Sequence, residues 1–232
     1  MMLTVSQLNH FYGESHSLWD LSLTIPAGAC TCVMGRNGVG KTTLLRCVMG
    51  LESARDGEIS IDGTALKPLP AESRARLGIG YVPQGREIFA RLTVEENLRI
   101  GITTRGGKGH EALAQVYDMF PVLKKMRRRR GGDLSGGQQQ QLAIGRALVL
   151  EPRLLILDEP TEGIQPNIVQ EIGDLIIRLN RELGLTVLLV EQKLPFARRV
   201  ADRFCVMDKG RVVASDAMDR LSDDLVRQYL SV

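Results

Sequence analysis

The sequence predicts an α/β domain that is interrupted by a helical insertion. About the first sixty residues contain short runs of alternating apolar and polar residues, the period of a half-buried strand. Residues 85–150 are polar and mostly helical in pattern, and after Pro152 continuous apolar runs indicate strands buried on both faces. We therefore expect one domain over residues 1–232, with an α/β body at 1–84 and 151–232 and a helical subdomain at 85–150.

The elements of the first part follow from apolar alternation broken by glycine and proline. A helix is expected at 41–49, because a glycine-rich turn precedes it and Gly50 gives a common helix end. Pro83 stops the last strand of this part. The expected strands are residues 3–9, 18–25, 29–34, 58–62 and 79–82.

The insertion and the last part contain clear helix and strand signals. Thr93 and Glu96 have the spacing of a capping box, and a further helix is expected at 111–119, after a loop rich in glycine and charge at 105–109. The remaining expected strands are 154–157, 186–190, 204–207 and 211–214, and the remaining expected helices are 166–183, a short one after 190, and 221–230.

Composition narrows the class of protein. A net charge of +3 and an aromatic content of 4% do not favour nucleic-acid binding. No apolar run approaches the roughly 18 residues that span a bilayer, and the N-terminal residues lack a signal-peptide pattern, so we expect a cytoplasmic protein. The four cysteines form no Cys-x-x-Cys pair, which favours small buried thiols over a metal site; they are Cys30, Cys32, Cys47 and Cys205.

The stretch GRNGVGKTT, residues 35–43, follows an expected strand and opens an expected helix, as a phosphate-binding loop does. Its glycines allow backbone N–H groups to face phosphate oxygens beside the positive end of the helix dipole. Lys41 would reach the β- and γ-phosphates and Thr42 would ligate Mg²⁺; the alternative is a tight glycine turn with a surface lysine. The candidate nucleotide-binding residues here are Gly35, Arg36, Asn37, Gly38, Val39, Gly40, Lys41, Thr42 and Thr43.

The stretch LLILDEP, residues 154–160, places two acids at the end of a buried strand. Asp158 is the candidate Mg²⁺ ligand, and Glu159 is the candidate general base that orients and polarises the attacking water. An apolar run before two acids could be only a strand that leads into a capped helix. The phosphate loop in the same chain favours the nucleotide interpretation.

The stretch LSGGQ, residues 134–138, opens another expected helix. Ser135 and Gln138 have capping-box spacing, which needs no ligand. However, each glycine at a helix start costs about 1 kcal/mol relative to alanine and leaves the N–H groups bare, which suits an anion.

The three stretches, in this order, resemble the Walker A, signature and Walker B motifs of ABC ATPases. The resemblance implies a P-loop NTPase core with an N-terminal antiparallel β subdomain and an inserted α-helical subdomain, which hydrolyses ATP with Mg²⁺. It also implies a head-to-tail dimer, in which the signature of each subunit caps the γ-phosphate held by the other. The residues that would do so are Ser135, Gly136, Gly137 and Gln138.

Further positions match the family one at a time. Tyr12 matches the aromatic residue that stacks on adenine, the alternative being a strand aromatic that packs a small core. Gln84 matches the glutamine that reaches Mg²⁺ or the attacking water. Gln192 replaces the usual switch histidine, so hydrolysis should lack an acidic limb of histidine type. Gln165 replaces the aspartate found after Walker B in many members, which puts communication across the dimer through that residue in doubt.

The stretches VPQGREIF, DEPTEGIQP and LLVEQKL resemble the second ATP-binding subunit of importers for urea or short amides, relatives of the branched-chain amino acid importers. This resemblance implies a motor subunit on the inner face of the cell membrane. Its partners would be a second ATP-binding subunit, identical or related, two transmembrane permease subunits and, indirectly, a solute-binding protein. The alternatives are a branched-chain amino acid importer ATPase and a soluble ABC ATPase acting on nucleic acid; no second phosphate loop or heptad run supports the latter.

The basic run KKMRRRR, residues 124–130, has two interpretations. It is either a solvated face of the helical subdomain or a surface close to anionic lipid headgroups. The family resemblance further implies that the insertion docks a cytosolic helix of the membrane partner.

Overall fold

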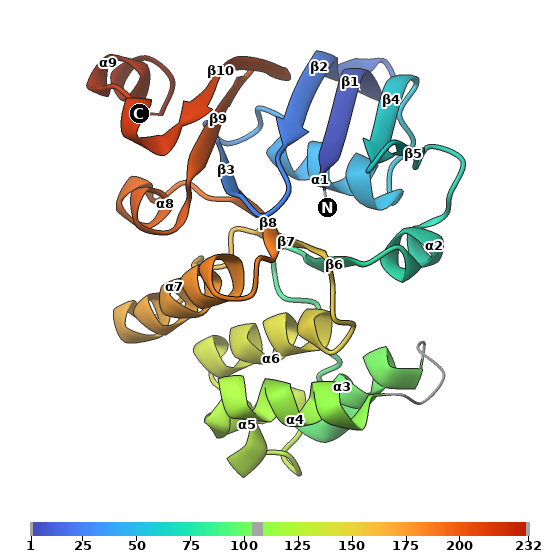
Figure 1. The fold of residues 1–232 in the computed structure, drawn as a ribbon, viewed down its shortest axis with the longest axis vertical. Coiled ribbons are helices and arrows are strands. Elements are labelled where there is room, and N and C mark those ends of the chain that lie inside the picture. Colours follow the sequence, from blue (N-terminus) through green and yellow to red (C-terminus); the bar gives the residue numbers. More distant parts are fainter. Residues whose placement is uncertain (1, 104–108, 231–232) are drawn as a thin grey trace.

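The computed structural model describes residues 2–103 and 109–230, and its strands form two sheets (Figure 1). The smaller sheet is antiparallel, with the order β2-β1-β4-β5. It consists of β1 (Leu3–Tyr12), β2 (Ser15–Ile25), β4 (Asp56–Ile61) and β5 (Thr64–Ala65).

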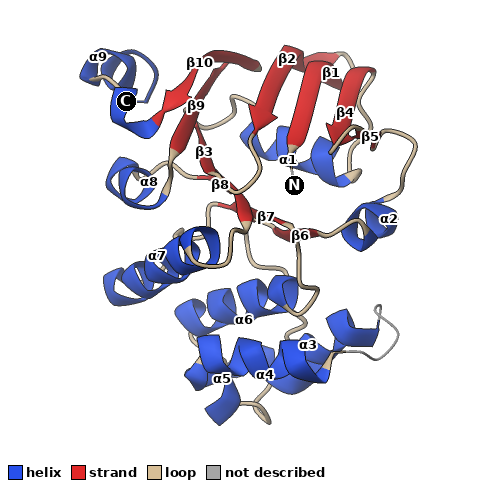
Figure 2. Ribbon diagram, viewed as in Figure 1, coloured by secondary structure: helices blue, strands red, loops and turns tan. Residues whose placement is uncertain are grey.

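The larger sheet has the order β10-β9-β3-β8-β7-β6, and all its pairs are parallel except the β9–β10 hairpin (Figure 2). Every residue of β3, β7 and β8 is buried, as expected for strands covered on both faces. The strands are β3 (Cys30–Met34), β6 (Ile79–Val82), β7 (Leu154–Asp158), β8 (Thr186–Val190), β9 (Arg203–Asp208) and β10 (Arg211–Ala217).

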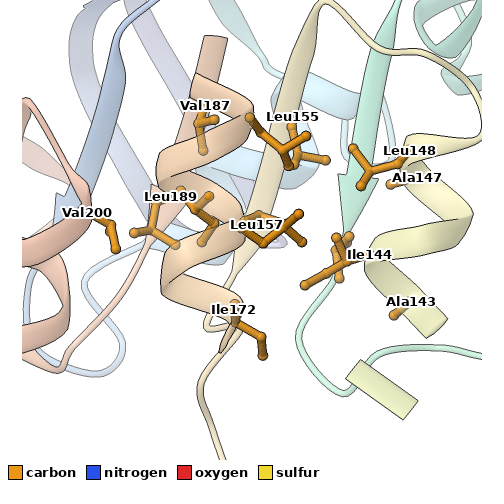
Figure 3. Close-up of a cluster of buried hydrophobic side chains, with 14 of the residues drawn as sticks. Ala143, Ile144, Ala147, Leu148, Leu155, Leu157, Ile172, Val187, Leu189 and Val200 are labelled. Atoms are coloured by element: carbon orange, nitrogen blue, oxygen red, sulfur yellow. The ribbon is translucent and has the colours of Figure 1, made fainter. Parts of the chain in front are cut away.

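Helices cover both faces of the larger sheet, and strand alternation assigns each face its own core. Leu154 and Ile156 of β7 pack with α1 (Lys41–Met49) and the smaller sheet. Leu155 and Leu157 pack with α6 (Gly136–Leu148), α7 (Pro166–Arg181) and α8 (Leu194–Val200), as Figure 3 shows. The β-strand period therefore sends alternate side chains of one strand into two separate clusters.

The helices between β6 and β7 gather at one end of the molecule, away from the antiparallel sheet (Figure 1). They are α3 (Val94–Thr103), α4 (His110–Met119), α5 (Pro121–Lys125), the turn η1 (Gly131–Asp133) and α6. The expected capping box is present, because Thr93 and Glu96 exchange hydrogen bonds between side chain and backbone at 2.7 and 3.2 Å. Within this group, the long α6 lies between the other helices and the larger sheet (Figure 1).

Most expected elements are found within one to three residues of their predicted ends. Three short elements are not predicted: β5, α2 (Ala71–Arg76) and α5 are too short for a periodic signal. The expected helix at 221–230 is found over residues 223–230, where Ser222 caps a short α9 (Asp223–Leu225) that continues into the π-helix η3 (Val226–Leu230). A further turn, η2 (Met218–Arg220), precedes it. Residues 104–108 of the expected loop lie outside the described residues.

Candidate nucleotide site

The candidate site lies at the carboxyl ends of the parallel strands, where open α/β sheets bind their ligands. The phosphate loop follows β3, Asp158 ends β7, and Gln84 and Gln192 each follow the end of β6 and β8 by two residues. Segments far apart in the sequence therefore meet at one edge of the sheet.

The phosphate loop adopts a backbone that requires glycine. Gly38 and Gly40 have φ angles of 79° and 103°, in the left-handed region that costs other residues energy. A Cβ at Gly40 would lie 2.8 Å from the Leu18 Cδ2, and one at Gly35 would collide with the Met207 carbonyl oxygen. The loop thus lies directly against neighbouring parts of the chain at Gly35 and Gly40, where no side chain fits.

Lys41 is buried at the start of α1, and its ammonium is held by the loop itself. The Nζ atom donates to the carbonyl oxygens of Gly35 at 2.7 Å and Arg36 at 2.9 Å. Desolvation lowers the pKa of Lys41, while the nearby charges of Glu159 and Asp158 act in the opposite direction. The cation is therefore fixed at the centre of the loop, within reach of a phosphate chain.

Asp158 is only 1% exposed, and neither of its carboxylate oxygens has a hydrogen-bond partner. Burial raises the pKa of this carboxyl to about 6. The Thr42 hydroxyl is near enough to oppose the shift, without meeting the geometry of a regular hydrogen bond. Two bare carboxylate oxygens beside a hydroxyl are hard oxygen donors of the kind that suits Mg²⁺, so the residues present fit that ion.

Glu159 is the centre of a hydrogen-bonded group of side chains. Its Oε1 accepts from Gln192 Nε2 at 2.5 Å and its Oε2 from Gln84 Nε2 at 3.5 Å. Gln84 also donates to Glu162 at 2.9 Å. Glu159 has a φ of 48°, and an L-residue held in that conformation costs on the order of 1 kcal/mol. In this conformation the carboxylate meets both amides.

These side chains share one cleft of about 640 Å³ with the phosphate loop. Tyr12 lines its far side, 46% exposed, with its ring edge-on to His10 at 4.5 Å between centroids, so it does not pack a core. Of the sequence-predicted residues, the cleft brings together Tyr12, Asn37, Gly38, Gly40, Lys41, Thr42, Thr43, Gln84, Glu159 and Gln192. Gly35, Arg36, Val39 and Asp158 lie behind or beside its lining.

Sequence reasoning missed Glu162, although it stands three residues after Glu159. Its partner Gln84 is 78 positions away in sequence. The cleft is further lined by Ser15, His16, Ser17, Trp19, Lys209 and Gly210.

The signature residues are not part of this cleft. Ser135 and Gln138 form the expected capping box, with bonds of 3.0 and 3.4 Å at the start of α6. Over the part of the chain that the structure describes, none of residues 135–138 lines the cleft that holds Lys41. The helix start therefore faces something other than the phosphate loop of the same molecule.

Three other predicted features are placed by the structure. The charged residues of the basic run 124–130 are all exposed. Gln165 is exposed at the start of α7 and makes no capping bond. The four cysteines are buried free thiols; desolvation raises the pKa of Cys30, Cys47 and Cys205 to about 12 and raises the pKa of Cys32 well above its ordinary value. No helix in residues 2–103 and 109–230 is long and apolar enough to cross a membrane.

A phosphate loop between β3 and α1, facing an acidic pair at the end of β7, defines a nucleotide-binding ATPase. The family model for ABC transporters matches residues 18–162. The chain is 43% identical to the high-affinity branched-chain amino acid transport ATP-binding protein BraG of Pseudomonas aeruginosa, over 93% of this chain and 92% of the relative. It is 38% identical to the probable branched-chain amino acid transport ATP-binding protein LivF of Archaeoglobus fulgidus, over 95% and 94%.

Solved structures agree with these sequence relatives. A nucleotide-free ATP-binding cassette from an ABC transporter has a TM-score of 0.85 at 25% identity, over 98% of this chain and 97% of that one. A dimeric post-hydrolysis state of the cassette MJ0796 bound to ADP and Pi has a TM-score of 0.84 at 28% identity, over 93% and 98%. The chain therefore belongs to the ABC transporter family, and it is an ATP-binding, ATP-hydrolysing subunit. The expected ABC ATPase fold is confirmed.

The comparisons support an importer subunit, but they do not support urea or a short amide as its solute. BraG and LivF carry branched-chain amino acids in their names, which favours the alternative over urea or a short amide. Urea stays a prediction.

Proposed function

We propose that the protein is the ATPase motor of an importer for branched-chain amino acids. The observation that supports this most strongly is the 43% identity to BraG over 93% of the chain. The motor would bind ATP in the cleft between Tyr12 and the phosphate loop, with Tyr12 stacking on the adenine. Residues 85–150 would act as a subdomain that moves relative to the body formed by 1–84 and 151–232.

Each side chain in the cleft would have a separate task. Lys41 and the loop N–H groups would bind the phosphates, and Thr42, Asp158 and Gln84 would ligate Mg²⁺, which when bound neutralises phosphate charge. Glu159 would accept the proton of the attacking water. The amides of Gln84 and Gln192, which already bond Glu159, would orient that carboxylate and the water. Metal holding and base work then rest on two different carboxylates.

The site would be completed by a second subunit, identical or related. Ser135 to Gln138 lie outside the cleft of their own chain, and a capped helix start with bare glycine N–H groups suits a phosphate. In a head-to-tail pair, that helix start would cap the γ-phosphate bound by the opposing Lys41. Closure on ATP and opening after hydrolysis would drive the two permease subunits.

The permease contact would lie in a groove of about 940 Å³ between the Gln84 loop, α2 and α6. Exposed apolar side chains line this groove, and they are Leu51, Leu77 and Ile100. Such a groove suits a short amphipathic helix of a membrane partner on the inner face of the cell membrane. Uptake of leucine against uptake of urea, by the assembled transporter in vesicles, would separate the two candidate solutes.

Glu159→Gln tests the proposed chemistry. The amide keeps the size of the side chain but cannot accept the proton, so kcat for ATP hydrolysis should fall about 100-fold or more. ATP binding should persist, and the variant should accumulate as an ATP-bound dimer on size-exclusion chromatography. Glu162→Gln, in the same cleft but bonded to Gln84 alone, should lose far less. Turnover of Glu159→Gln at the wild-type rate would refute Glu159 as the base.

A further inference from the structure

Glu191, directly after β8, carries a carboxylate that is buried beside the candidate nucleotide site. It is 2% exposed, and four hydrogen-bond donors surround it. Its Oε1 accepts from the N–H of Thr161 at 3.3 Å and from the Thr161 hydroxyl. Its Oε2 accepts from the N–H groups of Gln192 at 2.9 Å and Lys193 at 3.0 Å. One side chain therefore joins the loop after β7 to the loop after β8.

Only a carboxylate satisfies all four donors. Each oxygen accepts from at least one backbone N–H, and a backbone N–H cannot become an acceptor. A glutamine at this position would turn its NH₂ group toward Thr161 or toward Gln192 and Lys193. In either orientation a donor would face a donor inside the protein, which leaves buried polar groups unpaired.

The two loops that Glu191 joins carry Glu159, the proposed base, and Gln192, the amide proposed to orient it. Thr161 lies two residues after Glu159, and Gln192 directly follows Glu191. Across the same gap, the Gln192 amide donates to Glu159 Oε1 at 2.5 Å, and Lys193 Nζ donates to the Thr161 carbonyl at 2.8 Å. The position of the Gln192 amide on Glu159 thus depends on how the two loops are held together.

We propose that Glu191 is a positioning residue, which holds the Gln192 loop against the Thr161 loop and so sets the Gln192 amide on the Glu159 carboxylate. This inference rests on the proposed roles of Glu159 and Gln192 in hydrolysis. Glu191 itself would not bind nucleotide or water, because its oxygens already accept from the four donors. Its effect on turnover would pass through Gln192.

Glu191→Gln should lower kcat about tenfold or more while KM for ATP changes less than about twofold, because Lys41 and Tyr12 bind ATP independently of this clamp. The matched control is Glu171→Gln. The Glu171 carboxylate accepts from the Gln141 side-chain amide at 2.9 Å, and that amide can turn over to suit a glutamine. The control should keep wild-type kcat. An unchanged kcat in Glu191→Gln would overturn the proposal.

Thr161→Val is the milder variant, because it removes the hydroxyl and leaves the backbone N–H. It should lower kcat by a smaller factor than Glu191→Gln and likewise leave KM for ATP nearly unchanged. It also provides a test if Glu191→Gln lowers the melting temperature too far for assay. A Thr161→Val protein with wild-type kcat would likewise count against the clamp.

A double-mutant cycle separates positioning from general loss of stability. If Glu191 acts through Gln192, the variant Glu191→Gln/Gln192→Ala should match the kcat of Gln192→Ala within about twofold. If the double variant instead loses kcat by the product of the two single factors, the proposal is overturned and Glu191 has an independent structural role. Failure of the proposed function is seen separately, since it would leave Glu159→Gln active whatever the cycle gives.

Discussion

At the scale of one residue, Asp158 shows how the nucleotide site lowers the stability of the folded protein. The fold buries this carboxylate, leaves both oxygens without partners, and places Glu159 and Glu162 close enough to raise its pKa further. Since the pKa of about 6 lies above the ordinary value of 3.8, the folded protein holds this proton more tightly than the unfolded chain does. The ionised form is therefore destabilising until a cation arrives.

Asp158→Asn should raise the melting temperature in Mg²⁺-free buffer at pH 8. The cost of the ionised carboxylate, at most on the order of 3 kcal/mol, is fully present above about pH 6 and vanishes as the pH falls toward 3.8. The advantage of the variant should shrink over that window in thermal-shift measurements. Mg²⁺ with nucleotide should stabilise the wild type more than the variant. A variant that melts at or below the wild type at pH 8 would show that Asp158 is not strained.

The residues of the site differ in how well they can be predicted from the sequence. The phosphate loop, Asp158 and Glu159 stand in contiguous stretches whose spacing has a chemical reason, so they could be predicted. Glu162 and Glu191 could not, because Gln84, which bonds Glu162, lies 78 positions away, and Thr161, which bonds Glu191, lies 30 positions away. A single carboxylate in a sequence gives no sign of the donors that surround it.

At the scale of elements, α6 has a capped start and a body that packs in the core, and the sequence alone could not separate these two roles. Its start is closed by the Ser135–Gln138 capping box, and its body packs into the core against the larger sheet. Gly137 packs tightly, because a Cβ there would lie 3.0 Å from two side-chain carbon atoms of Ile168 on α7, which would have to shift by a few tenths of an ångström. Packing thus favours glycine at one of the two positions without any ligand.

Ser135→Ala should separate the capping role from the proposed phosphate contact. Loss of an N-cap costs about 1 kcal/mol, which should lower the melting temperature by a few degrees and leave ATP binding by the monomer intact. Loss of the γ-phosphate contact should instead abolish turnover. ATPase assays and nucleotide titration on one preparation measure both. Weakened binding by the monomer would return Ser135 to a purely local role.

The elements that could be predicted are those with a long or fully apolar pattern. The buried strand β8 and the helix α1 are found at their predicted bounds, because apolar runs and glycine turns fix both ends. The helical segment after β10 could be predicted, and Ser222 caps its start. Its change from the α-helix α9 to the π-helix η3 could not be predicted, because the spacing of apolar residues does not signal it.

At the scale of the whole molecule, the larger sheet separates two hydrophobic cores and collects the chemistry at one edge. The phosphate loop and α1 belong to the core shared with the antiparallel sheet. The signature helix α6 belongs to the other core. The phosphate loop and the signature helix therefore pack on opposite faces of the sheet, which is why a second subunit is proposed to join them.

The most direct test of this central claim mixes two inactive variants. Lys41→Ala removes the phosphate contact and Ser135→Ala removes the signature contact, and each variant alone should be inactive. A mixed pair contains one intact composite site, formed by Lys41 of one chain and Ser135 of the other. Equal mixing should therefore restore roughly a quarter of wild-type ATP turnover, since about half of random pairs are mixed and each has one of two sites intact. No recovery, in a sample where mixed pairs are shown to form, would contradict the composite site.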